Sequence, residues 1–111
     1  VNALGASGLQ PAIPQTTRLF APSPNPVIGG VQQVFFPMDI TEPTDVILHV
    51  FDIGGSLIFR QDHYLFPGVY QADNGAPVWR LDKSLANGVY FYRLVAKQVT
   101  FNGTLAIARK R

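Results

Sequence analysis

Few side chains in this sequence of 111 residues have the types and spacing that catalysis or metal binding requires. The histidines His49 and His63 are fourteen residues apart, and His49 lies in an apolar run, where a half-exposed sheet residue is the simpler interpretation. Asp39, Glu42 and Asp45 could share a loop and hold calcium, but they lack the glycine-punctuated spacing of a calcium loop. No serine lies in a nucleophile elbow, and no carboxylates form a recognisable catalytic pair. We therefore expect no catalytic residue, no cofactor and no metal site, and a chain that is not an enzyme.

Three further patterns could support binding, and each has a structural alternative. Trp79 with Tyr70 could form a platform for a sugar or peptide, but a tryptophan in a sandwich core is the simpler interpretation. Asn102-Gly103-Thr104 fits the N-glycosylation pattern and also the tip of a hairpin. Aromatic residues beside Arg93 hint at base stacking, yet a net charge of +2 is too modest to predict nucleic-acid binding.

The elements that position these residues must come from a single turn-rich domain. Hydrophobic residues make up 47% and charged residues 14% of the chain, which is enough apolar material for a core. The absence of cysteine excludes disulfides, thiolate zinc sites and thiol catalysis. No apolar stretch is long enough to span a membrane. No signal peptide is visible at Val1, so we expect a mature form or an excised piece.

Charge is distributed unevenly along the sequence. From Arg80 onward, seven basic residues and one acid give +6, whereas residues 1–79 hold two basic residues and six acids, giving −4. A domain polarised in this way could orient on a charged partner. The alternative is a solvated basic edge strand, since basic residues on sheet edges also discourage aggregation.

Proline usage divides the chain near residue 26. Five of the nine prolines lie between Pro11 and Pro26, so residues 1–26 are predicted to form an extended Pro-rich linker or arm, which Leu19 and Phe20 could anchor. Residues 27–111 carry β signals separated by turn residues about every ten positions. The only helix candidate is a turn at 82–86 that Asp82 could cap. The predicted fold is an all-β, Ig-like antiparallel β-sandwich of about seven strands, with runs at 31–36, 45–51, 56–60, 69–72, 78–81, 88–101 and 104–108.

Two details of the last strands sharpen this prediction. Alternation in the run from Gly88 places Tyr90, Tyr92, Leu94 and Ala96 on one face, the expected core face. Gly88-x-Tyr90-x-Tyr92 also occupies the positions of the tyrosine corner of Ig-like sandwiches. Asn102-Gly103 is the strongest hairpin signal and is expected to turn the chain back through 104–108.

A combination of motifs resembles a known family. The segments are Pro24-Asn25-Pro26, the strand end and turn Val50–Gly55, the Leu85–Leu94 segment LANGVYFYRL, and a basic terminal strand. Together they resemble the C-terminal sorting domain of type IX secretion cargo in Bacteroidetes and relatives. They are also similar to the Ig-like domain of the flagellar hook-capping protein. The resemblance covers about residues 18–111.

The resemblance implies a seven-stranded sandwich at the end of a larger secreted protein. In that family an outer-membrane translocon and its shuttle recognise the domain, a sortase-like protease often removes it, and the cargo becomes attached to surface lipopolysaccharide. The expected location is therefore extracellular or at the cell surface, reached through the periplasm, with protein partners. The alternative is a structural Ig-like subunit or accessory domain of a surface assembly. The partner-binding residues that the resemblance implies are Gly54, Gly55, Asn87, Gly88, Tyr90, Arg93, Arg109, Lys110 and Arg111.

Overall fold

Short apolar runs separated by prolines and glycines form ten strands and no helix in residues 16–72, 74–97 and 99–109, the residues that the computed structural model describes. Seven of these strands fall on the runs that the sequence predicts, and the predicted run 88–101 is divided between two of them. The three short strands at Arg18–Leu19, Val27–Gly29 and Met38–Ile40 were not predicted. The strands are β1 (Arg18–Leu19), β2 (Val27–Gly29), β3 (Gln33–Phe35), β4 (Met38–Ile40), β5 (Thr44–Phe51), β6 (Leu57–Leu65), β7 (Gly68–Tyr70), β8 (Val78–Arg80), β9 (Gly88–Ala96) and β10 (Val99–Arg109).

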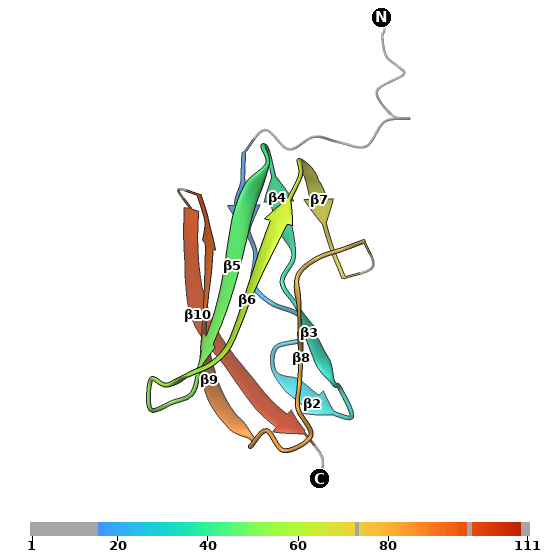
Figure 1. Ribbon diagram of the computed structural model, residues 1–111. Helices are drawn as coiled ribbons and strands as arrows, with labels where there is room; N and C mark the ends of the chain where they lie inside the picture. The colour runs from blue at the N-terminus through green and yellow to red at the C-terminus, as the bar shows by residue number, and fades with distance from the viewer. Residues whose placement is uncertain (1–15, 73, 98, 110–111) are drawn as a thin grey trace, which may run out of the picture.

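The strands form two facing layers (Figure 1). One layer is a five-stranded sheet in the order β2-β10-β9-β5-β6, antiparallel throughout except that β2 runs parallel to β10. The other layer combines a three-stranded sheet, β1-β4-β7, with the pair β3-β8. The first strand segment changes layers, because β1 pairs with β4 and β2 pairs with β10. The predicted Ig-like β-sandwich is confirmed.

Alternate residues of the two central strands fill the space between the layers, as the pleat of a strand requires. The face of β9 that the sequence predicts as core is buried. Tyr92 meets Phe36 of the opposite layer edge-to-face at 5.6 Å, and burial raises the pKa of the Tyr92 phenol. Trp79 packs against Tyr90 at 6.0 Å. The buried residues of β5 and β9 are Val46, Leu48, Val50, Tyr90, Tyr92, Leu94 and Ala96.

The predicted hairpin at Asn102-Gly103 is wrong. β9 ends at Ala96 and β10 begins at its partner Val99, so the chain reverses direction between these two residues, directly after Ala96. Lys97, which follows Ala96, has φ 49°, in the left-handed region that a tight hairpin turn requires. Asn102-Gly103 lies instead within β10, where the ring of Tyr92 on the paired strand covers Gly103. Because Gly103 has no side chain, it leaves room for the Tyr92 ring, and this is its role here rather than forming a turn.

The described part of the predicted arm belongs to the sandwich. Leu19 pairs with β4 and is buried, which is the anchoring that the sequence indicates. Ser23 exchanges two backbone hydrogen bonds with Phe35, at 2.9 and 2.8 Å. The Asn25 side chain bonds the backbone of β10 at the Thr104 carbonyl (2.9 Å) and the Ala106 amide (3.2 Å). Pairing therefore begins before residue 27, because the prolines at 22, 24 and 26 fall between β1 and β2 rather than within them. Residues 1–15 lie outside the described residues.

Candidate functional site

Four of the residues that the family resemblance singles out meet at one end of the sandwich, where the chain passes from β8 to β9. Tyr90 lies near the start of β9, and its hydroxyl donates a 2.6 Å hydrogen bond to the carbonyl of Ala86, four residues earlier. This bond is the defining contact of a tyrosine corner, so that prediction is confirmed. Gly88 precedes Tyr90 with φ 151°, a backbone conformation that favours glycine.

Asn87 fastens this corner to the end of the last strand. Its side-chain amide donates to the carbonyl of Arg109 at 2.9 Å, and its carbonyl oxygen accepts from the Arg109 amide at 3.0 Å. On this side of β10, the pairing with β9 ends at Ile107 and Gly88, and the Asn87 side chain takes the place of the strand beyond that point. Both backbone groups of Arg109 are thus hydrogen-bonded on the side that faces the corner.

The Arg109 guanidinium also binds the backbone of this corner. It donates to the carbonyls of Asp82 (2.7 Å) and Leu85 (3.2 Å). Asp82 caps the turn that follows it, because its carboxylate accepts a hydrogen bond from the Ser84 amide at 3.0 Å. Hydrogen bonding from Ser84 lowers the pKa of the Asp82 carboxyl, and the charge of Arg109 lowers it further. The predicted capping role of Asp82 is confirmed, in a turn rather than a helix.

The Gly54-Gly55 turn lies at the same end and joins β5 to β6. Asp52 organises it by accepting the Ser56 amide at 2.9 Å with its side chain and the Gly55 amide at 2.9 Å with its carbonyl. Gly55 has φ 88°, which a residue with a side chain rarely adopts. Ile53 is 75% exposed at the tip. The hydrogen-bonded turn therefore presents an apolar side chain to solvent.

A groove of about 520 Å³ separates this turn from the β8–β9 corner. Aromatic side chains of Phe59, Trp79 and Tyr90 line it, together with the carboxylates of Asp52 and Asp82. Phe59 and Asp52 are not among the binding residues predicted from the sequence. The available signal for Asp52 was its position two residues before a glycine pair, since aspartate commonly caps such turns. The other lining residues are Ile58, Arg80, Ser84, Leu85 and Ala86.

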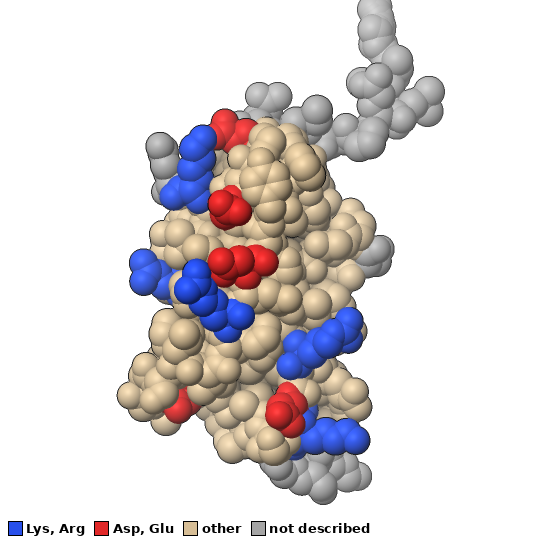
Figure 2. All heavy atoms as spheres, in the orientation of Figure 1, with Lys and Arg blue, Asp and Glu red and all other residues tan. Residues whose placement is uncertain are grey.

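The remaining predicted binding residues are not part of this corner. Arg93 lies on the outer face of the five-stranded sheet, in register with His49 and Asn102 of the neighbouring strands. Lys110 and Arg111 lie outside the described residues. Figure 2 shows acidic and basic side chains in neighbouring positions on the face that it displays. The charge asymmetry along the chain is therefore not a separation of charge on this face.

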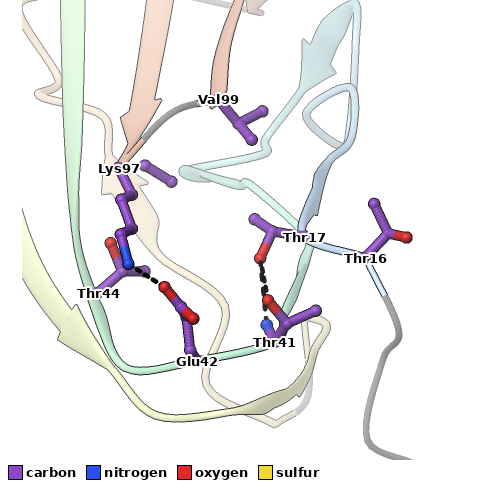
Figure 3. A pocket seen from close by; sticks show the side chains of 8 residues that line it. Thr16, Thr17, Thr41, Glu42, Thr44, Lys97 and Val99 are labelled. Atoms are coloured by element: carbon purple, nitrogen blue, oxygen red, sulfur yellow. Dashed lines mark hydrogen bonds and ion pairs between the residues drawn. The ribbon is translucent and has the colours of Figure 1, made fainter.

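A second hollow, of about 420 Å³, lies at the opposite end of the sandwich (Figure 3). The Lys97 ammonium forms an ion pair with Glu42 across its mouth. The hydroxyls of Thr17 and Thr41 bond each other at 2.8 Å. These contacts tie the loop between β4 and β5 to the segment before β1 and to the β9–β10 turn.

In the described part of the chain, the residues that the sequence offered as candidates for metal binding do not come together in one site. There, no group of three or more His, Asp or Glu side chains gathers where it could hold a metal ion. Trp79 is 4% exposed, which makes it a core residue. His49 Nδ1 and His63 Nε2 are buried without a hydrogen-bond partner, and burial lowers the pKa of His63 against a smaller opposing effect of Asp62. The described residues form no helix that could cross a membrane.

No protein-family model matches the chain, and no curated protein is significantly similar to it in sequence. What is established is the class of protein, an all-β domain with an Ig-like sandwich fold.

Proposed function

We propose that this chain is a non-catalytic sorting domain, recognised by an outer-membrane export apparatus at the end of the sandwich where β10 finishes. The observation that carries the proposal is spatial. Asp52 of the Gly54-Gly55 turn and Tyr90 of the tyrosine corner are distant in sequence and line one groove, and Asn87 bonds the end of β10 to this corner. These are the segments through which the chain resembles sorting domains of type IX cargo.

The contacts at this end suit recognition by a protein better than chemistry on a small molecule. Asn87 and Arg109 use their polar groups on the backbone of the domain itself, so they hold a shape and do not present reactive groups. Ile53 and Lys83 are exposed beside the groove and available to a partner. A pre-formed surface of this kind can be recognised by rigid docking. The expected location is extracellular or at the cell surface, reached through the periplasm.

The test is export of a periplasmic reporter carrying the chain at its C-terminus, in a host with a working type IX apparatus. We expect the reporter outside the cell, and about tenfold less of it when Ile53→Asp and Lys83→Glu are combined at the groove end. The matched control is Glu42→Lys at the opposite end, which changes charge without touching the groove.

Retention of the reporter carrying the unaltered chain in the periplasm would refute the sorting function. If the groove variant is exported as well as the control, the recognised surface lies elsewhere and the site assignment fails. A folded chain that is not exported but is required for a surface structure supports the alternative, a structural Ig-like subunit.

A further inference from the structure

The strand β6 forms a long edge of the five-stranded sheet. It has nine residues, and β5 is its only neighbour in the sheet order among the described strands. The opposite edge of the same sheet is β2, with three residues. Proteins usually keep edge strands short or cover them, because an unpaired edge offers main-chain hydrogen bonds to another chain. This edge is available for strand pairing.

The sequence of β6 is complementary to itself when read in the antiparallel direction. With Gln61 opposite Gln61 of a second copy, Arg60 faces Asp62, Phe59 faces His63, and the apolar ends face each other. Opposite charges and aromatic pairs in directly opposed positions stabilise antiparallel strands. Moving the centre to Arg60 or to Asp62 would place two like charges opposite each other. The strand therefore favours one register with itself.

The contacts of β6 in the single chain fit this pairing. Arg60 and Asp62 project from the same side of the strand and form an ion pair, with Nε to Oδ1 at 3.1 Å and Nη2 to Oδ2 at 3.3 Å. Both side chains are more than half exposed, so they can exchange this contact for one across a dimer axis. Tyr64 is 59% exposed and Ile58 39%, which leaves apolar surface beyond the charged centre. The irregularity of the β5–β6 ladder lies next to Leu57, outside the central positions.

We propose that a second copy of this chain pairs antiparallel with β6 about a two-fold axis at Gln61, joining two five-stranded sheets into one sheet of ten strands. The axis makes each Arg60 face Asp62 of the second copy, so the same patch serves both partners, as a two-fold interface requires. This interface goes beyond the proposed sorting function and does not depend on it, although Ile58 and Phe59 of β6 also line the groove. An edge contact alone is smaller than a standard interface, so we expect a dimer that depends on concentration.

A cysteine at the axis tests the register directly, since the chain contains no other thiol. In the dimer the two copies of Gln61 have Cα atoms about 4.5–5.5 Å apart, within disulfide range. We expect the full chain with Gln61→Cys to form a covalent dimer under mild oxidation. Tyr64→Cys is the control, because three residues on each side of the axis put these positions roughly 20 Å apart. Equal cross-linking of the two variants, or none in the Gln61→Cys variant, would overturn the proposal.

A charge exchange tests the pairing without cysteine. Asp62→Arg gives a strand with two cations, and Arg60→Asp gives one with two anions. In sedimentation equilibrium from about 10 μM to about 1 mM, we expect each variant alone to associate about tenfold more weakly than the unaltered chain. An equimolar mixture of the two variants should regain association, because each cation then faces an anion. An unaltered chain that stays monomeric across this range, or a mixture that associates no better than its components, would overturn the proposal.

Discussion

Replacing Gly103 with alanine tests the packing that places Asn102-Gly103 inside a strand. A Cβ atom at Gly103 would lie 2.3 Å from Oη, 2.6 Å from Cζ and 2.8 Å from Cε2 of Tyr92. These atoms belong to a rigid ring that is 5% exposed and held between Phe36 and Phe101, so it has little room to move. The alanine must therefore displace the ring or the strand.

The expected loss follows from overpacking of a well-filled core. Such substitutions cost about 1–3 kcal/mol, and we expect Gly103→Ala near the upper end because three ring atoms are too close. A loss of this size lowers the Tm by about 10 °C or more in a domain of this length. Urea unfolding followed by fluorescence of Trp79, the only tryptophan and a buried one, measures the change in free energy.

Two comparisons make the result specific. Gly30→Ala is the matched control: no atom lies within 4 Å of its added Cβ, and we expect a change within about 0.5 kcal/mol. Tyr92→Leu removes the ring, so the double variant should lose less than the sum of the single changes, by about 1 kcal/mol or more. If Asn102-Gly103 were a hairpin turn, alanine would be disfavoured by the backbone and the two losses would simply add. Additive losses would refute the packing described here.

Three further outcomes are expected. Tyr90→Phe removes the bond to Ala86 and should cost about 1 kcal/mol in urea unfolding; no change would contradict a stabilising tyrosine corner. Asn87→Ala removes both side-chain bonds to the Arg109 backbone, so hydrogen exchange of the Arg109 amide should accelerate, whereas equal protection would show that the end of β10 is held by other contacts. His63 has a pKa lowered by burial from 6.5, so the unfolded chain binds more protons below pH 6.5. The stability that the neutral imidazole provides is thus present above pH 6.5 and is lost as the pH falls below it. The free energy of unfolding should differ less between pH 7.5 and pH 5.5 for His63→Gln than for the unaltered chain. An equal difference in the two proteins would exclude His63 as a source of this pH dependence.

Several elements could be predicted because their determinants are local. The alternation of Tyr90, Tyr92, Leu94 and Ala96 identified the buried face of β9. The tyrosine corner depends on a bond between residues four apart, and the Asp52–Ser56 turn on another of the same span. Neighbouring residue types suffice to indicate such contacts.

The position of the last hairpin could not be predicted in the same way. Asn-Gly favours a tight turn by its local conformational preference. Two features oppose a turn at Asn102-Gly103. Nine residue pairs join β9 and β10 in register, and the Tyr92 ring fills the space above Gly103. Moving the turn to residue 102 would break this ladder and expose the core face. Lys97 accepts a strained backbone conformation instead.

By itself the sequence predicted an all-β sandwich, the pattern of a tyrosine corner from Gly88 and a turn at Gly54-Gly55. Only the tertiary structure decided that Asn87 binds the backbone of Arg109, 22 residues away, and that Asn25 binds Ala106, 81 residues away. The physical reason is that short-range and long-range contacts have different determinants. A bond across a few residues depends on local conformational preference, whereas the choice of a distant partner depends on the register and burial of the whole sheet.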